Sequence, residues 1–378
     1  MSRARPQFWS LGGVDILGFF TAEHGVGEAA RSTVRALEAA ATRVNAINYT
    51  DTESRMSEQF RTDDKSEHEV LFLALNADHI PAAYGILGEE FFEDRYVISQ
   101  WFWELETAPP WFQAAFPLVD ELWAPTRFIE DMLRRSAPER VKVRYMPPAI
   151  AAPEVDKPVD RRHFGPDERF LFYFSFDFMS IAKRKNPVGL VEAYTREFAE
   201  SDGAQLVIKS INADKRPLDL ALLEAAIDNR DDITLMTEYQ SRRDASTLMS
   251  MADCYVSLHR SEGLGLTITE AMSLGVPVIA TAYSGNLDFM DEWNTWRVPC
   301  SLGPVGYGAG GYDPHAVWAD PDLDAAGRMM REVFENPADA RAKAAKARDH
   351  VLNAFTPEAA GTRMRRRLEE IWAELERR

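Results

Sequence analysis

Residues 258–285 read Leu-His-Arg-Ser-Glu-Gly-Leu-Gly-Leu-Thr-Ile-Thr-Glu-Ala-Met-Ser-Leu-Gly-Val-Pro-Val-Ile-Ala-Thr-Ala-Tyr-Ser-Gly, and they are the most informative part of the sequence. The apolar run 254–258 predicts a buried strand, and residues 276–281 predict the next one. Between them, apolar periodicity predicts a helix from Leu266 to Leu274, which Gly275 ends. A glycine-rich loop therefore joins a strand to the amino end of a helix in a β-α-β unit. Unpaired amides and the positive end of the helix dipole suit that loop to bind phosphate.

Two carboxylates, Glu262 and Glu270, bracket this loop. A diphosphate with a sugar on each side would meet the amides in its middle and one carboxylate at each end. A carboxylate can accept hydrogen bonds from two adjacent sugar hydroxyls. The pattern therefore predicts a nucleotide-sugar ligand. The alternative is that Gly263, Gly265 and Gly275 serve only turns and helix ends, which explains neither glutamate.

The composition predicts a two-domain protein without a disulfide framework. With 378 residues, the chain exceeds the size that one core usually reaches. No apolar stretch is long enough to cross a bilayer, and residues 1–6 lack the apolar segment of a signal peptide. The two cysteines, Cys254 and Cys300, do not form a metal-binding Cys-x-x-Cys pair. The cytoplasm is the expected compartment, and the net charge of −17 argues against a nucleic-acid partner.

Short apolar runs alternate with helical periodicity, which is typical of α/β domains with parallel sheets. The first series of predicted strands covers residues 14–20, 44–48, 70–75, 96–102, 121–124 and 141–146. The second covers residues 170–175, 205–209, 233–236, 254–258 and 276–281, and a glycine-rich loop at 303–311 follows it. A proline-rich linker is predicted between the two series, at residues 153–166. We therefore expect one domain at residues 1–152 and another at residues 167–355.

The segment from Glu262 to Glu270 resembles the Glu-x7-Glu signature of the retaining glycosyltransferases of family 4. Residues 275–281 and 284–285, Gly-Val-Pro-Val-Ile-Ala-Thr and Ser-Gly, also fit that family. The resemblance implies the α/β GT-B fold, in which two Rossmann-like domains with parallel sheets face each other across a cleft. It also implies that a C-terminal helix, here about residues 356–378, crosses back to the first domain.

The resemblance further implies roles for residues of the second domain. Glu270 would accept hydrogen bonds from the ribose, and Glu262 would face the donor sugar. The donor diphosphate would be bound by the loop and the first helical turn, at Gly263, Gly265, Leu266 and Thr267.

Basic side chains should neutralise the departing diphosphate, because enzymes of this fold generally use no metal. Arg184-Lys185-Asn-Pro matches a basic element of the family. An arginine expected after the preceding strand is missing, since residues 177–178 are Asp-Phe, and Lys209 could substitute for it. Arg260, at a strand exit, either helps to bind phosphate or forms a surface ion pair.

The first domain should supply the acceptor side. Residues 101–111, Trp-Phe-Trp-Glu-Leu-Glu-Thr-Ala-Pro-Pro-Trp, place Glu104 near the position where family members often have a histidine. We expect Glu104 in the cleft, because a carboxylate beside aromatic rings suits a sugar. The alternative is that Trp101 and Trp103 belong to the core.

Gly25-Val-Gly27-Glu-Ala-Ala30 opens a predicted helix over residues 29–41 and supports two hypotheses. As part of a glycosyltransferase it would be a flexible loop over the donor phosphates and the acceptor. It also satisfies the Gly-x-Gly-x-x-Ala fingerprint of an NAD-dependent oxidoreductase. Such a site needs an acidic residue at the end of the second strand, and that strand ends in Asn48.

We therefore expect a retaining hexosyltransferase that has no metal site and needs no cofactor. Its donor would be a nucleotide diphosphate sugar of the GDP-mannose or UDP-hexose type, and its acceptor a glycan or a lipid-linked hydroxyl. The alternatives are the oxidoreductase and a non-catalytic protein that binds a nucleotide-sugar or a glycan. The last predicted helix carries a basic cluster that could rest on an anionic membrane at the inner face, unless its apolar stripe docks on the protein itself. This cluster consists of Arg363, Arg365, Arg366 and Arg367.

Overall fold

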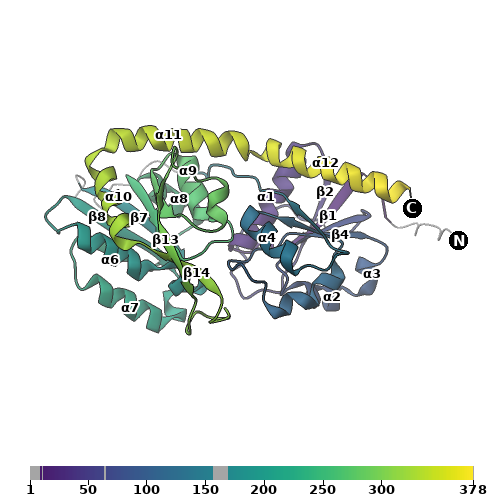
Figure 1. Ribbon diagram of the computed structural model, residues 1–378. Coiled ribbons are helices and arrows are strands. Elements are labelled where there is room, and N and C mark those ends of the chain that lie inside the picture. The colour runs from purple at the N-terminus through teal and green to yellow at the C-terminus, as the bar shows by residue number, and fades with distance from the viewer. Residues whose placement is uncertain (1–8, 11, 64, 156–168, 378) are drawn as a thin grey trace. The chain divides into compact units, whose positions relative to one another are not determined.

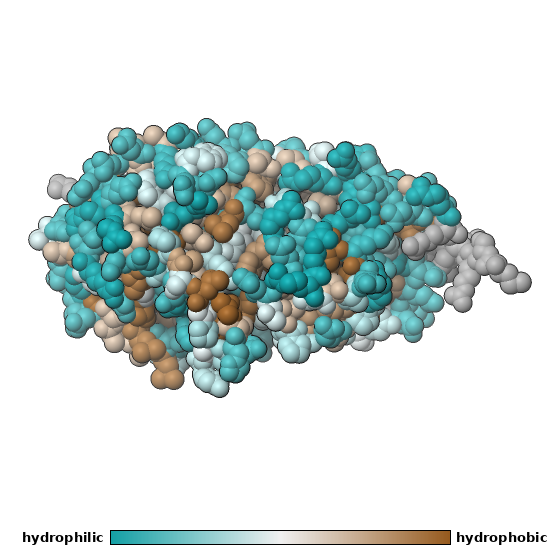
Figure 2. All heavy atoms as spheres, in the orientation of Figure 1, coloured by the Kyte–Doolittle hydropathy of each residue, from teal (hydrophilic) through white to brown (hydrophobic). Residues whose placement is uncertain are grey.

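The computed structural model describes residues 9–377 except residue 11, residue 64 and residues 156–168. The chain divides into two compact units, residues 1–150 with 353–378, and residues 151–352 (Figure 1). Residues 153–155 have no regular secondary structure, and the rest of the predicted linker, residues 156–166, lies outside the described residues. No helix among the described residues is long and apolar enough to span a bilayer. The face drawn in Figure 2 is mostly hydrophilic, with apolar residues in small groups.

The first unit is a doubly wound parallel sheet. Its strands lie in the order β2-β1-β3-β4-β5-β6. They are β1 Gly13–Gly18, β2 Arg43–Asn48, β3 Val70–Ala74, β4 Tyr96–Ser99, β5 Glu121–Ala124 and β6 Lys142–Tyr145. The helices are α1 Gly25–Ala39, α2 Ile80–Leu87, α3 Glu89–Phe92, α4 Arg127–Ser136 and α12 Pro357–Glu376. One hydrophobic core includes residues of α2 and α4, and a second one includes residues of α1 and α12.

Helix α1 begins earlier than the sequence predicts, at Gly25. Gly25 and Gly27 are therefore not a flexible loop but the first turn of a helix, which corrects the sequence-based expectation. His24 caps this turn, because its Nδ1 accepts a hydrogen bond from Gly27 N at 3.0 Å. A Cβ on Gly27 would lie 2.7 Å from the carbonyl oxygens of Phe19 and Ala22. Close packing of the helix on the preceding turn thus explains why residue 27 is glycine.

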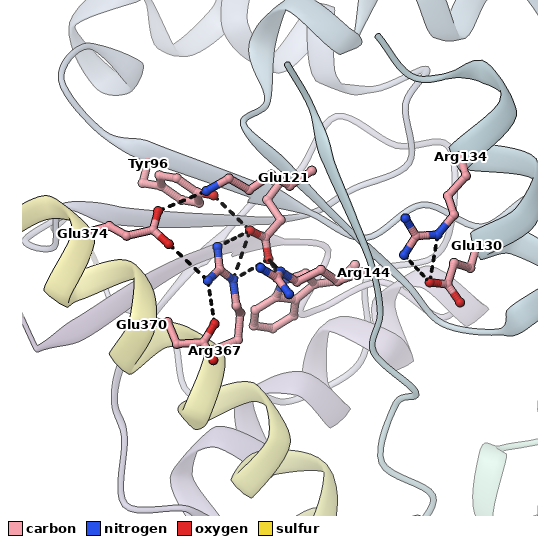
Figure 3. A network of polar contacts seen from close by, with 10 residues as sticks. Tyr96, Glu121, Glu130, Arg134, Arg144, Arg367, Glu370 and Glu374 are labelled. Atoms are coloured by element: carbon pink, nitrogen blue, oxygen red, sulfur yellow. Dashed lines mark hydrogen bonds and ion pairs between the residues drawn. The ribbon is translucent and has the colours of Figure 1, made fainter. Parts of the chain in front are cut away.

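A buried ion pair fixes α12 to the sheet of the first unit. Arg367 Nη2 donates to Glu121 Oε2 at 2.7 Å, and its Nε donates to Oε1 at 2.9 Å. Glu121 is fully buried and also accepts a hydrogen bond from Tyr96 Oη at 2.9 Å (Figure 3). Trp123 Nε1 donates to the same carboxylate at 2.9 Å. Because all these donors converge on one carboxylate, the buried charge is both paired and hydrogen-bonded.

The apolar stripe of α12 is covered by the protein itself. Its members are buried in the core that α1 shares: Met364, Leu368, Ile371 and Leu375. A Cβ on Gly361 would lie 1.8 Å from Ala36 O, so the two helices touch at a glycine. Arg365 Nη1 donates to Ala40 O at 2.6 Å. The docking alternative is therefore the observed one, and the stripe that a membrane would have to contact is not exposed.

The second unit has the strand order β12-β11-β10-β7-β8-β9. Its strands are β7 Phe170–Asp177, β8 Ala204–Ile211, β9 Ile233–Met236, β10 Cys254–Ser257, β11 Val278–Thr281 and β12 Trp296–Val298. Its helices are α5 Ala182–Lys185, α6 Pro187–Glu197, α7 Pro217–Ile227, α8 Arg242–Ser250, α9 Leu266–Leu274, α10 Leu323–Glu335 and α11 Pro337–Ala354. An antiparallel hairpin, β13 Cys300–Pro304 with β14 Val317–Pro321, replaces part of the predicted glycine-rich loop.

All strands of this second sheet that pair with β7 are parallel to it, but they are added on two sides. Strands β8 and β9 lie on one side of β7, and β10, β11 and β12 lie on the other, so the strand order switches between β7 and β10. In open α/β sheets, ligands bind beyond the carboxyl ends of the strands at such a switch point. The fold therefore directs attention to the loop after β7 and to the loop between β10 and α9.

Candidate functional site

The two loops at the switch point are joined by hydrogen bonds. Arg260 N donates to Arg184 O at 2.8 Å. Asn186 Nδ2 donates to Leu258 O at 2.9 Å, and Asn186 is almost fully buried. The segment after β7 and the segment after β10 therefore form one continuous surface at the carboxyl edge of the sheet.

A strained turn presents the cations of the first loop. Ile181 has φ +64°, a left-handed conformation that a β-branched residue rarely adopts. Its carbonyl oxygen accepts hydrogen bonds from Arg184 N at 2.9 Å and Lys185 N at 3.2 Å, which closes the one-turn helix α5. Such a conformation costs about 1–3 kcal/mol and persists only where its surroundings enforce it. The turn places the guanidinium of Arg184 and the ammonium of Lys185 on the second loop.

Both cations meet the carboxylate of Glu262. Lys185 Nζ forms an ion pair with Glu262 Oε1, and Arg184 Nη1 lies 3.2 Å from Oε2. Arg184 is also fixed by the backbone, since its Nη1 donates to Ser261 O at 2.9 Å and its Nε to Ser180 O at 3.2 Å. We call the three residues Arg184, Lys185 and Glu262 the charge cluster.

The charge cluster keeps Glu262 ionised. Burial alone would raise the pKa of Glu262, but Lys185 and Arg184 outweigh that effect and lower the pKa to about 2. With two cations and one carboxylate, the cluster has an excess positive charge at neutral pH. It can therefore attract an anion that replaces the carboxylate as the partner of its cations.

The loop that carries Glu262 is fixed by the segment after β11. Glu262 N donates to Ser284 Oγ at 2.8 Å, and Gly285 N donates to Glu262 O at 2.9 Å. Ser284 has φ +76°, a second strained residue at this site. A Cβ on Gly285 would lie 2.1 Å from Gly263 O, so only glycine permits this approach.

Helix α9 has the bounds that the sequence predicts, Leu266–Leu274, and its amino end lies in the same loop. Gly265, with φ +84°, precedes the helix and offers no side-chain cap. The amides of Leu266 and Thr267 belong to the first turn, where no partner exists within the helix. Thr267 Oγ1 accepts a hydrogen bond from Tyr255 Oη at 2.8 Å. This end of the helix therefore offers amides and a positive dipole to an anion.

Glu270 lies one turn further along α9. Its carboxylate faces Arg242 Nη2 of helix α8 at 3.4 Å, and its side chain is 16% exposed. Glu270 and Glu262 thus both pair with cations in this structure, one on each side of the amino-terminal turn of α9.

Two predicted phosphate ligands have other contacts. Lys209 is buried and its Nζ donates to Ser210 O at 3.0 Å, and burial lowers its pKa although Asp177 opposes this effect. Arg260 forms an ion pair with Asp320, so the ion-pair alternative is the observed one.

Glu104 belongs to the first unit and lies half-buried in the segment after β4. Trp101 is fully buried and packs edge-on against Phe112, with ring centroids 5.0 Å apart. Trp103 packs on Trp111 in the same way at 5.4 Å. Trp101 is therefore a core residue, as the alternative held, and the role of Glu104 stays a prediction.

Among the described residues, no group of three or more His, Cys, Asp or Glu side chains is arranged to hold a metal ion. Sequence reasoning did not identify Ile181, because nothing in the sequence signals an isoleucine at positive φ. It did identify the Ser284-Gly285 pair, but not that Ser284 accepts a hydrogen bond from the Glu262 amide.

Residues 164–300 match the family model described as glycosyl transferases group 1. No curated protein sequence matches the chain. The chain is similar in structure to sucrose-phosphate synthase from Thermosynechococcus elongatus, with a TM-score of 0.69 and 16% identity over 96% of this chain and 99% of that one. It is also similar to HepE of Anabaena solved with UDP-glucose, with a TM-score of 0.68 and 12% identity over 95% and 99%. A third similar structure is a glycosyltransferase from Rickettsia africae, with a TM-score of 0.62 and 14% identity over 97% of this chain and 99% of that one.

At these identities the likeness to solved structures establishes the fold, which is the two-domain α/β fold of the GT-B glycosyltransferases. The family match covers the loops and strands that build the charge cluster.

Proposed function

We propose that this protein is a retaining, metal-independent hexosyltransferase. Its donor is a nucleotide diphosphate sugar, a UDP-hexose or GDP-mannose, and its acceptor is a hydroxyl of a glycan or of a lipid-linked sugar. The observation that carries the proposal is the charge cluster beside the amino end of α9 at the switch point of the sheet. The similarity to HepE, which was solved with UDP-glucose, supports this class of donor.

In this proposal the diphosphate is bound by the amides of Leu266 and Thr267 and takes over the two cations of the cluster. Preorganised positive charge of this kind stabilises the charge that develops on a leaving phosphate. The bond from the anomeric carbon to the phosphate oxygen breaks while a bond to the acceptor oxygen forms on the same face. The acceptor proton goes to the leaving phosphate oxygen. Glu262, released from its cations, accepts hydrogen bonds from the donor sugar.

Glu270 is proposed to bind the ribose. Its carboxylate is 3.4 Å from Arg242 Nη2, and ribose hydroxyls would share or replace this partner. Lys209 is proposed as a secondary positive charge near the diphosphate, and Glu104 as a contact of the sugar from the first unit.

The oxidoreductase alternative loses support from the structure of the first unit. Gly27 N already donates to His24, so the amide that a dinucleotide phosphate would use has a partner. Arg31 Nη1 donates to the carbonyl oxygens of Phe20 and Ala22, in the segment between β1 and α1. Neither observation bears on the third alternative, a protein that binds a nucleotide-sugar without turnover.

The first experiment is thermal unfolding with UDP, GDP, ADP and NAD on wild type, Glu270→Ala and the matched surface control Glu292→Ala. A ligand at a hundred times its Kd adds about 2.7 kcal/mol to stability. Stabilisation by one nucleotide diphosphate that Glu270→Ala weakens and Glu292→Ala does not would support the donor site. Stabilisation by NAD alone would refute it. Hydrolysis of the matching nucleotide-sugar then distinguishes an enzyme from a protein that only binds the donor. NMR of the transfer product gives its anomeric configuration. Activity that persists in EDTA would support the proposed metal independence.

A further inference from the structure

The hairpin β13–β14 is joined to the two loops that build the charge cluster. It follows the carboxyl end of β12, so it leaves the sheet at the same edge as those loops (Figure 1). Ala319 N donates to Arg260 O at 2.9 Å, and Arg260 N in turn donates to Arg184 O at 2.8 Å. Arg260 also forms an ion pair with Asp320 of β14. The hairpin is therefore part of the framework of the site.

Lys183 anchors the loop of this hairpin, residues 305–316. Its Nζ donates to Val305 O at 2.8 Å and to Tyr307 O at 3.2 Å. Lys183 lies in the same one-turn helix as the two cations of the charge cluster, yet its ammonium donates to the loop, whereas those two cations pair with Glu262. A Cβ on Gly310 would lie 3.0 Å from the side chain of Ile181, so the loop also packs on the strained residue.

The loop has a fixed backbone but presents one aromatic ring to solvent. Val305 and Ala309 are buried at 1% and 2% exposure, whereas Tyr307 is 84% exposed. Gly306 and Gly308, with φ +69° and +83°, flank Tyr307 and give the turn its shape. Because the Tyr307 carbonyl is held by Lys183, the ring is carried by ordered backbone and loses less entropy when it binds.

We propose that loop 305–316 is a carbohydrate-binding element of this site, in which the Tyr307 ring stacks on the acceptor sugar and Lys183 is a positioning residue. The proposal rests on the proposed glycosyl transfer. A tyrosine ring offers an apolar face to the C–H groups of a sugar and a hydroxyl to its polar edge. Hydrogen bonds of Lys183 and Ala319 link the loop and its hairpin to the segments that carry the charge cluster, so a sugar, the substrate class of that site, is the partner it fits.

The test compares transfer with donor hydrolysis in four variants, Tyr307→Ala, Tyr307→Phe, Lys183→Met and the exposed surface control Leu222→Ala. The donors are UDP-glucose and GDP-mannose, and the acceptors are p-nitrophenyl glucosides, mannosides and galactosides. We expect Tyr307→Ala and Lys183→Met to raise the KM for the glycoside about three- to tenfold. Donor hydrolysis and stabilisation by the nucleotide should stay at the wild-type level. Tyr307→Phe should retain most of the transfer, and Leu222→Ala all of it.

Unchanged transfer in Tyr307→Ala would overturn the proposal, and so would an equal loss of transfer and donor hydrolysis. Donor hydrolysis by the wild type without transfer to any glycoside of the panel would also contradict it. If no nucleotide stabilises the wild type, the proposed function itself fails and the role of the loop fails with it. That outcome is recognised from the wild type alone, before any variant is compared.

Discussion

Replacing Glu262 by Gln should destabilise the protein, because Arg184 and Lys185 lose the negative charge of Glu262 at a largely buried position. Lys185 and Arg184 hold the pKa of Glu262 at about 2, against an ordinary value of 4.5. At 1.36 kcal/mol for each pKa unit, the difference 4.5 − 2 corresponds to about 3 kcal/mol of unfolding free energy at neutral pH. For a domain of about 200 residues, this lowers the Tm by roughly 6–12 °C.

The effect should depend on pH in a defined direction. The folded pKa of Glu262 is depressed, so its contribution is complete above the unfolded value of 4.5 and is lost as the pH falls toward 2. The difference between wild type and Glu262→Gln in urea unfolding should therefore shrink between pH 5 and pH 3. Glu292→Gln is the matched control, since Glu292 is 83% exposed and its pair with Arg297 is worth at most about 1 kcal/mol.

Nucleotide binding gives the same variant a second outcome. If the diphosphate takes the cations from Glu262, removal of that carboxylate should let free UDP or GDP bind more tightly, while transfer of the sugar is lost. Isothermal titration measures the affinity, and donor hydrolysis measures the activity. The reasoning is refuted if Glu262→Gln unfolds within 1 kcal/mol of wild type at pH 7, or if it binds the nucleotide more weakly.

Three more predictions concern the buried carboxylate of Glu121, the close contact of Gly285 and the buried thiol of Cys254. Glu121→Gln should cost about 3–5 kcal/mol in urea unfolding, because Arg367 stays buried without its main counterion; a loss below 1 kcal/mol would contradict this. Gly285→Ala should abolish stabilisation by nucleotides, since a Cβ 2.1 Å from Gly263 O displaces the loop, and wild-type stabilisation would show that the loop adapts. Cys254 should resist iodoacetamide at pH 8 until urea unfolds the protein, because burial raises its pKa; mass spectrometry of the folded protein would reveal early labelling.

Local patterns predicted the elements that depend on local causes. Strands β5 and β9 and helix α9 have the predicted bounds, because apolar runs and a terminal glycine define them within a few residues. The predicted strand 96–102 ends instead at Ser99, since the chain leaves the sheet and Trp101 packs into the core. The sequence does not predict the hairpin β13–β14, because β13 includes Gly303 and Pro304. Pairing with β14 overrides the low strand propensity of these two residues.

The site was predictable to the extent that it depends on a motif. The glutamates of the signature and the basic pair could be identified in the sequence, but not the contact between them, since 77 positions separate Lys185 from Glu262. The strained backbone of Ile181 has no sequence signal at all. The contact of Lys183 with loop 305–316 likewise depends on chain folding over more than a hundred positions.

Both glutamates of the signature are paired with cations, and this affects how the site can bind an anion. Glu262 balances one charge of Lys185 and Arg184, and Glu270 faces Arg242. In the proposed function, a diphosphate would exchange partners with a carboxylate instead of entering an open positive pocket, so the net gain in binding free energy is smaller than the number of contacts suggests. The proposed exchange would also release Glu262 at the point where a sugar hydroxyl needs a hydrogen-bond acceptor. Recognition of the sugar would then be coupled to recognition of the diphosphate. This coupling would account for the position of Glu262 in the same loop as the amino end of α9.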